Sequence, residues 1–403
     1  MHETLPAILV LLTSAVLAVA LFRAFKLPAM LAYFVVGILL GPKTFGLMPD
    51  NEANRELAEF GIVFLMFSIG LEFSISQLYA MRRIVLGIGG MQVVLSMGLI
   101  MLICLGLGLS WKTALIVSGA FAMSSTAIVS KLLVERLDLN SRHGRVSIGV
   151  LLFQDLAVVP LLVLIPAIAS PSGSLAYTLG LAGLKAAIIL SLLFVIGKNL
   201  MNRWFGVVAR QRSRELFIMN VLMVTLLLAY STKLAGLSYA LGAFIAGMLI
   251  SETRFRYQVE SDIAAFRDIL MGLFFITIGM LLDFNAVASQ LGTVLMITVG
   301  LIVFKALVVA LLTYAFKFES GVAVRAGVTL AQAGEFSFVV IALGLEHGLI
   351  SNGVLQLVLA SSLLSMLVAP FIIQHNLQIA EFFSRTYTKN RKDQIETIQA
   401  AGK

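Results

Sequence analysis

Charged residues are scarce in this sequence. Of its 403 residues only 12% are Asp, Glu, Lys or Arg, and 60% are hydrophobic, whereas soluble domains carry roughly 25% charged residues. Because the deficit runs along the whole chain, we expect a protein that crosses a membrane many times and not a soluble domain with one anchor. The apolar runs do not alternate in hydrophobicity over about 10 residues, which argues against the strands of a membrane β-barrel.

Cysteines and metal-ligand patterns are also nearly absent. The single cysteine, Cys104, lies in an apolar run; it can form no intrachain disulfide, and we expect an inert thiol. The four histidines lack metal-ligand spacing. The sequence contains no Gly-rich phosphate-binding loop, nucleophile elbow or HExxH motif. We therefore expect no enzyme, no bound cofactor and no metal site.

Long apolar runs dominate the chain instead. A membrane-spanning helix needs about 20 mostly apolar residues. The sequence predicts thirteen such helices, near 5–22, 27–41, 56–78, 84–107, 112–134, 146–169, 177–200, 215–233, 236–251, 263–282, 287–315, 325–345 and 353–374. We thus expect an all-α polytopic membrane domain over 1–375 and a polar, amphipathic cytoplasmic tail over 376–403.

The net charge of +8 would suit a nucleic-acid ligand, but its distribution argues otherwise. Basic residues gather in the odd-numbered connections and the tail, and the even-numbered connections hold only Lys43, Arg55, Lys112 and Lys233. This asymmetry follows the positive-inside rule. We expect no nucleic-acid partner, and a protein of the bacterial inner membrane with its N-terminus outside and its C-terminus in the cytoplasm.

The chain resembles itself at an offset of about 210 residues. Three matches fall in register: Phe34–Leu39 with Phe244–Leu249, Ser68–Leu71 with Thr277–Met280, and Pro160 with Pro370. The matched helices are seven apart, and an odd shift inverts the direction of crossing. The segments 27–169 and 236–374 are therefore predicted to be inverted-topology repeats, which are typical of secondary transporters with a site near the bilayer midplane.

Three ionisable side chains fall in the middle of predicted spans: Asp155, Lys305 and Glu335. Such residues are costly in a membrane and mark functional sites by default. Gln154 beside Asp155, and Pro160 five residues on, favour a functional role for this aspartate. A structural ion pair between Asp155 and Lys305 is the alternative, and it is compatible with transport.

Two predicted spans have polar interruptions. One contains Ser124, Ser125 and Thr126, and the other runs from Gln332 to Ser337. The repeat makes them partners and sets Ser125 opposite Glu335. Unwound backbone at membrane depth is tolerated where it lines a cavity or is buried in protein. The alternative is that the hydroxyl groups bond back to their own helix or to a neighbouring one.

These residues resemble the second family of bacterial cation:proton antiporters, and within it the Kef-type glutathione-regulated potassium efflux systems. The motifs are Gly37-Ile-Leu-Leu-Gly41-Pro42, Phe64-Leu-Met-Phe-Ser-Ile-Gly70-Leu-Glu72, Ser124-Ser-Thr-Ala-Ile, Leu152-Phe-Gln154-Asp155, Gly272-Leu-Phe-Phe-Ile-Thr-Ile-Gly279-Met and Ala331-Gln-Ala-Gly-Glu335-Phe-Ser. The likeness implies a sodium/proton antiporter-like fold of 13 helices. In that fold a core domain with crossed, interrupted helices moves against a dimerisation domain, which implies a homodimer.

The resemblance also implies roles for single residues. Asp155 matches the ion-binding aspartate of the family, with Gln154 and the segment Ser124–Thr126 around the ion. Gln332 to Glu335 match the second interrupted helix of the family, and Lys305 resembles its intramembrane lysine. In the mechanism that the residues suggest, Lys305, Gln332 and Glu335 balance the charge of the exposed helix ends or couple the ions. Sodium-type relatives usually carry Asp-Asp or Asn-Asp where this sequence has Gln154-Asp155, which favours potassium and leaves the partner of Lys305 open.

A cytoplasmic connection with Gln258, Glu260 and Asp262 resembles the acidic loop that contacts the soluble nucleotide-binding regulatory domain of this family; an ordinary solvated loop is the alternative. That domain does not follow here, because the sequence stops at Lys403. We expect an ungated or weakly active core that does not respond to glutathione adducts.

The expected activity is exchange of a monovalent cation, potassium in preference to sodium, for protons, with both ions competing for Asp155. If Asp155 alone titrates, electroneutral one-for-one exchange is the simplest stoichiometry. A sodium:proton antiporter and a ligand-gated, channel-like potassium efflux protein remain alternatives. A membrane enzyme would need a nucleophile–base arrangement or a metal cluster, and the sequence offers neither.

Overall fold

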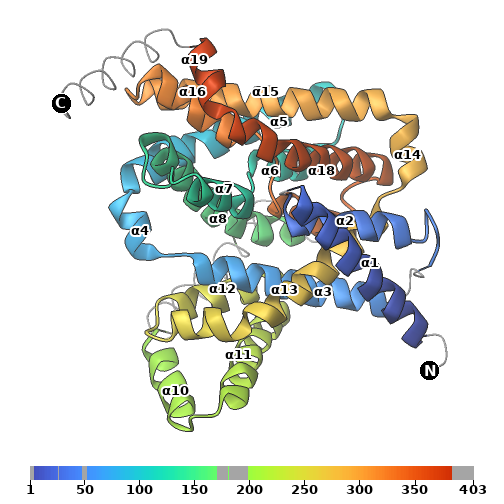
Figure 1. The fold of residues 1–403 in the computed structure, drawn as a ribbon, viewed down its shortest axis with the longest axis vertical. Coiled ribbons are helices and arrows are strands. Elements are labelled where there is room, and N and C mark those ends of the chain that lie inside the picture. Colours follow the sequence, from blue (N-terminus) through green and yellow to red (C-terminus); the bar gives the residue numbers. More distant parts are fainter. Residues whose placement is uncertain (1–3, 26, 48–51, 170–179, 181–197, 384–403) are drawn as a thin grey trace. The chain divides into compact units, whose positions relative to one another are not determined.

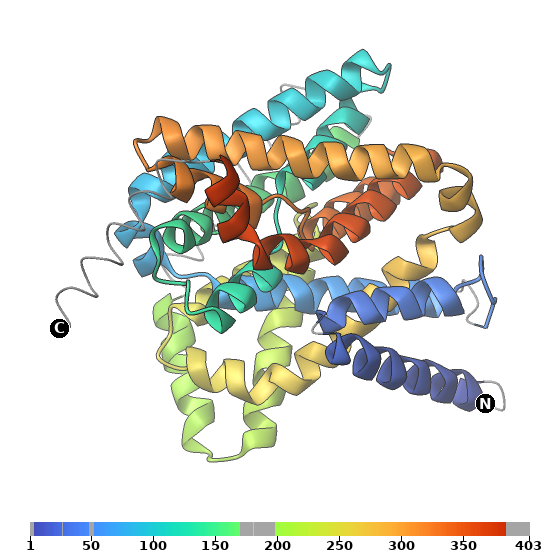
Figure 2. The same ribbon diagram turned by 45° about the horizontal axis from the view of Figure 1, so that its top comes forward.

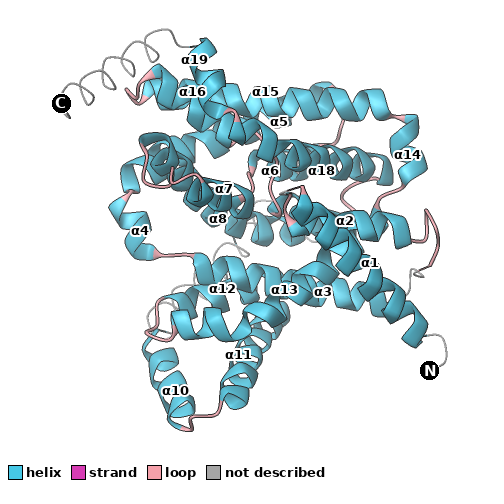
Figure 3. Ribbon diagram, viewed as in Figure 1, coloured by secondary structure: helices cyan, strands magenta, loops and turns pink. Residues whose placement is uncertain are grey.

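The computed structural model describes residues 4–25, 27–47, 52–169, 180 and 198–383. Every regular element in these ranges is a helix, and none is a strand (Figure 3). The all-helical prediction is therefore confirmed. The predicted helix at 177–200 falls almost wholly outside the described residues.

The chain divides into two compact units, and each takes segments from both predicted repeats. The first unit comprises Met1–Tyr79, Val158–Ser289 and Ala342–Ser351; the second comprises Ala80–Ala157, Gln290–Ile341 and Asn352–Lys403. Among the described residues, seven helices are long and apolar enough to cross a bilayer, and five shorter apolar helices accompany them. The chain is thus a multi-pass membrane protein.

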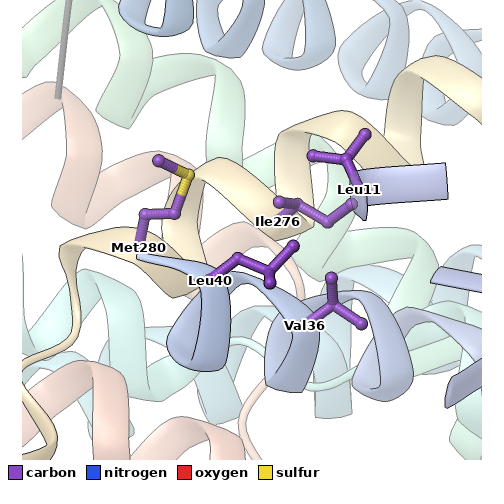
Figure 4. Close-up of a cluster of buried hydrophobic side chains, with 5 residues drawn as sticks. All are labelled: Leu11, Val36, Leu40, Ile276 and Met280. Atoms are coloured by element: carbon purple, nitrogen blue, oxygen red, sulfur yellow. The ribbon is translucent and has the colours of Figure 1, made fainter. Parts of the chain in front are cut away.

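The helices of the first unit are labelled in Figure 1. They are α1 (Thr4–Ala24), α2 (Ala29–Leu40), α3 (Glu52–Glu72), most of α4 (Ile75–Ala80), α10 (Lys198–Arg210), α11 (Arg214–Leu234), α12 (Tyr239–Ser251), α13 (Arg256–Leu281) and α14 (Phe284–Ser289). An apolar cluster of Leu11, Val36, Leu40, Ile276 and Met280 joins α1, α2 and α13 (Figure 4).

The second unit contains both interrupted helices. Its elements are a π-helical stretch (Arg83–Gly89), α5 (Gly90–Gly106), α6 (Trp111–Ala122), α7 (Thr126–Glu135), the first part of α8 (Arg142–Ala169), α15 (Leu291–Ala315), α16 (Ser320–Thr329), the first part of α17 (Phe336–Glu346), α18 (Asn352–Gln374) and α19 (Asn376–Phe383).

Glycines allow close helix contacts in the first unit, and they are the glycines that the repeat matches. A Cβ on Gly279 of α13 would lie 2.3 Å from the Phe34 carbonyl oxygen of α2. A Cβ on Gly247 of α12 would lie 2.1 Å from the Phe67 carbonyl oxygen of α3. The contact of α2 with α13 therefore has a counterpart in the contact of α12 with α3. This correspondence agrees with two repeats of one ancestral unit.

We expect Gly247→Ala to lower the free energy of unfolding by about 1–3 kcal/mol, because the methyl group would force α12 away from α3. Gly98→Ala is the matched control, since a Cβ there would meet nothing within 4 Å and alanine favours the helix. Thermal unfolding in detergent measures both. Equal midpoints for the two variants would contradict this account of the contact.

The predicted regulatory connection has a different structure from the one expected. The sequence placed Gln258, Glu260 and Asp262 in a loop that ends at residue 262, but α13 begins at Arg256. All three residues therefore lie in the first two turns of a helix. Asp262 pairs with Arg214, which begins α11, at 2.8 Å. The regulatory role of this segment stays a prediction.

Candidate functional site

Two helices break at the same place in the second unit. The first break separates α6 from α7, and the second separates α16 from α17. The Ser124 hydroxyl of the first break donates to the Leu330 carbonyl of the second at 2.8 Å. A Cβ on Gly334 would lie 2.5 Å from the Ser124 carbonyl oxygen, so glycine permits this close approach. The predicted interruptions and their pairing are confirmed.

Extended backbone and a serine cap produce the first break. Met123, which follows α6, is extended (φ −80°, ψ 149°). Ser125 then caps α7, because its hydroxyl accepts from the Ile128 amide at 3.2 Å, as serine commonly does at a helix start. The break leaves the last carbonyls of α6 and the first amides of α7 without partners inside their own helices. Charged side chains form hydrogen bonds at both of these helix ends.

Lys305 lies beside the C-terminal, carbonyl ends of α6 and α16. Its side chain is fully buried on α15, and its ammonium donates to the carbonyls of Met123 and Gln332, the second at 2.7 Å. These carbonyls follow α6 and α16, so the cation faces the negative ends of two helix dipoles. The structural ion pair between Lys305 and Asp155 stays a prediction.

Glu335 lies beside the N-terminal, amide end of α7. It is 4% exposed, and one carboxylate oxygen accepts from the Ala127 amide in the first turn of α7 at 3.4 Å. A carboxylate is stabilised at the positive end of a helix. The repeat set Ser125 opposite Glu335, and the structure brings their two segments into contact.

Asp155 lies on α8 and is 6% exposed. Its Oδ1 accepts from the Thr126 hydroxyl at 3.1 Å. Thr126 is the first residue of α7, so this carboxylate also sits beside a helix start. A hydroxyl and a carboxylate are hard oxygen ligands of the kind that alkali cations and protons share.

Gln154 connects this site to α5. Its Oε1 accepts from the Ser124 amide at 2.7 Å, and its Nε2 donates to Gln92 Oε1 at 2.7 Å. Gln92 in turn donates to the carbonyl of Ala122, the last residue of α6, at 3.1 Å. Gln92 was not predicted from the sequence. Its signal was the same one that marked Asp155, a polar side chain inside an apolar run.

The Gln332 side chain behaves differently from its backbone. Its carbonyl accepts from Lys305, but its buried amide nitrogen and oxygen have no hydrogen-bond partner among the described residues. Buried amide groups rarely stay unpaired in proteins.

The predicted site residues divide between the two units. The second unit holds Asp155, Gln154, Ser124, Ser125, Thr126, Lys305, Gln332 and Glu335, whereas the first holds Gln258, Glu260 and Asp262.

Crossed, interrupted helices beside a buried carboxylate, in an all-helical membrane domain, define a secondary transporter fold. Residues 10–378 match the transmembrane domain of the sodium/hydrogen exchanger family, and the chain belongs to this family.

Curated relatives are named as potassium efflux antiporters. The chain is 41% identical to a putative K(+) efflux antiporter, KefB, of Alkalimonas amylolytica, over 94% of this chain and 58% of the relative. It is 40% identical to the chloroplastic K(+) efflux antiporter 1 of Arabidopsis thaliana, over 93% of this chain and 32% of the relative. The chain therefore spans between a third and three fifths of the length of these relatives.

A solved structure shares the fold. The sodium proton antiporter MjNhaP1 of Methanocaldococcus jannaschii aligns with a TM-score of 0.71 at 18% identity, over 94% of this chain and 99% of that one. The sodium/proton antiporter-like fold is therefore confirmed.

Proposed function

We propose that the chain exchanges a monovalent cation, potassium in preference to sodium, for protons, and that the two ions compete for Asp155. The observation that carries this proposal is the contact of the buried Asp155 carboxylate with Thr126 at the break between α6 and α7. A carboxylate in low-dielectric surroundings is costly while charged. Either a proton or a bound cation neutralises it.

Competition couples the two flows. The occupied site is neutral and crosses the barrier, whereas the bare carboxylate does not, so one ion must replace the other on each side. The whole site lies in the second unit. We attribute alternating access to movement of this unit against the first. Lys305 and Glu335 hold the ends of the broken helices in place during that movement.

Potassium is favoured by the residue beside the aspartate. Gln154 is neutral, and its amide is engaged by Ser124 and Gln92, so Asp155 is the single carboxylate at this point of α8. The relatives at about 40% identity carry potassium in their names. Potassium is more weakly hydrated than sodium and loses its water more easily, which suits a site with a single carboxylate.

Purified protein in liposomes with an imposed pH gradient tests this function. We expect potassium to collapse the gradient at a lower concentration than sodium or lithium. Equal or better exchange with sodium would reverse the assigned selectivity and leave antiport intact. Currents of single-channel size, without proton counterflow, would contradict antiport itself. Homodimer formation and orientation in the membrane stay predictions.

A further inference from the structure

A basic pocket lies in the first unit, whereas the residues of the proposed transport site belong to the second unit and to other segments of the sequence. Its volume is about 500 Å³. It is lined by Asn202, Arg203, Gly206, Val207 and Arg210 of α10 and by Arg254 of the turn between α12 and α13. The five α10 residues recur at the spacing of one helix face. The pocket therefore combines one face of α10 with a turn some fifty residues further on.

Packing beneath the pocket fixes its walls. Phe205 is fully buried on α10, and its ring lies 5.7 Å from that of Phe217 on α11 and 6.0 Å from that of Phe255. Asn202 Oδ1 accepts from the Arg254 amide at 3.3 Å. Helices α10 and α11 lie side by side in both views (Figures 1 and 2). The arginines thus extend from a packed framework.

Within the part of the chain that the structure describes, the three arginines have no carboxylate partner. None of the salt bridges between described residues includes Arg203, Arg210 or Arg254, although Arg214 nearby pairs with Asp262 at 2.8 Å. The dipole of α10 favours a cation at Arg210, and the Arg254 guanidinium lies 4.9 Å from the Phe255 ring. Neither interaction occupies the N–H donors of the guanidinium groups. Guanidinium groups present these donors in a fork that matches phosphate oxygens.

Gly206 keeps the pocket open. A Cβ at this position would lie 3.1 Å from Nη2 of Arg254, so a side chain would compete with the guanidinium for the same space. Glycine inside a helix costs about 1 kcal/mol relative to alanine. The open space beside Arg254 offsets that cost if a ligand uses it.

The surroundings of the pocket are apolar and exposed. Leu200, Trp204 and Val207 of α10 are 54%, 44% and 53% exposed, so the basic helix also presents apolar surface. Helices with this combination lie in the membrane interface and bind anionic lipids. The next helix, α11, is a candidate membrane span. A soluble phosphate compound would have no use for the apolar side chains.

We propose that this pocket binds the phosphate group of an anionic membrane lipid, with Arg203, Arg210 and Arg254 as donors and the lipid tails against the apolar surface of α10. The proposal rests on the first unit alone and does not depend on the transport site.

Native mass spectrometry of the purified full chain, titrated with phosphatidylglycerol, measures the binding. We expect Arg203→Gln combined with Arg254→Gln to weaken binding roughly tenfold or more, because two charge-assisted hydrogen bonds are lost. The control is Arg83→Gln combined with Arg145→Gln, two exposed arginines outside the pocket with the same change in charge. This control should bind as the unmodified chain does.

Gly206→Leu tests the pocket without a change in charge. It favours the helix and fills the space beside Arg254, so it should weaken phosphatidylglycerol binding while the fold is kept. Phosphatidylcholine and inorganic phosphate are the other two probes. Equal binding of phosphatidylcholine, tighter binding of free phosphate than of the lipid, or full binding by the arginine and Gly206 variants would each overturn the proposal.

Discussion

Asp155→Asn should reduce cation–proton exchange to the rate of protein-free liposomes. Asparagine keeps the size of the side chain and an oxygen that can accept from the Thr126 hydroxyl, which now donates at 3.1 Å. The amide takes up no proton at physiological pH and has no charge to balance a cation. Both halves of the exchange therefore stop, and the effect is larger than that of any neighbouring change.

The fold should survive this substitution. Replacing a buried charge with a neutral isostere removes a desolvation cost, so we expect a thermal midpoint equal to or above that of the unmodified protein. Asp268→Asn is the matched control, since Asp268 is exposed on α13 and pairs with its neighbour Arg267. Exchange at the normal rate by the Asp155 variant would remove this carboxylate from the mechanism.

The site was partly readable from the sequence because the membrane makes polar residues conspicuous. Asp155, Lys305 and Glu335 stood out against apolar runs, and an offset of about 210 residues placed Ser125 opposite Glu335. The structure joins these segments through the Ala127 amide. Inverted repeats turn a one-dimensional offset into a spatial pairing, which explains why this contact was predictable.

Other features left no such signal. The partners of Lys305 are the backbone carbonyls of Met123 and Gln332, and every residue carries a carbonyl. A charge search over side chains could suggest only Asp155 or Glu335 as its partner. The start of α13 at Arg256 was hidden by its polar first turns, because a hydropathy threshold marks where lipid begins and not where a helix begins.

Lys305→Met should lower the free energy of unfolding by about 2–5 kcal/mol. Methionine matches the length of the lysine stem and fills the space, but it donates no hydrogen bond. The Met123 and Gln332 carbonyls would then stay buried without the ammonium that now satisfies them. The negative ends of α6 and α16 would also face each other without a cation. Thermal unfolding in detergent measures the loss.

Lys317→Met is the matched control, because Lys317 is exposed just after the end of the same helix α15. It should leave the midpoint unchanged.

Charge moved per turnover, measured in liposomes, separates two roles for Lys305. If the lysine only holds the helix ends together, the surviving fraction of Lys305→Met exchanges ions with the same charge per turnover as the unmodified protein. If the lysine also gains and loses a proton in each cycle, that charge changes. Stability and charge movement that both match the control would show that the contacts of Lys305 with the two carbonyls contribute nothing to holding the crossed helices together.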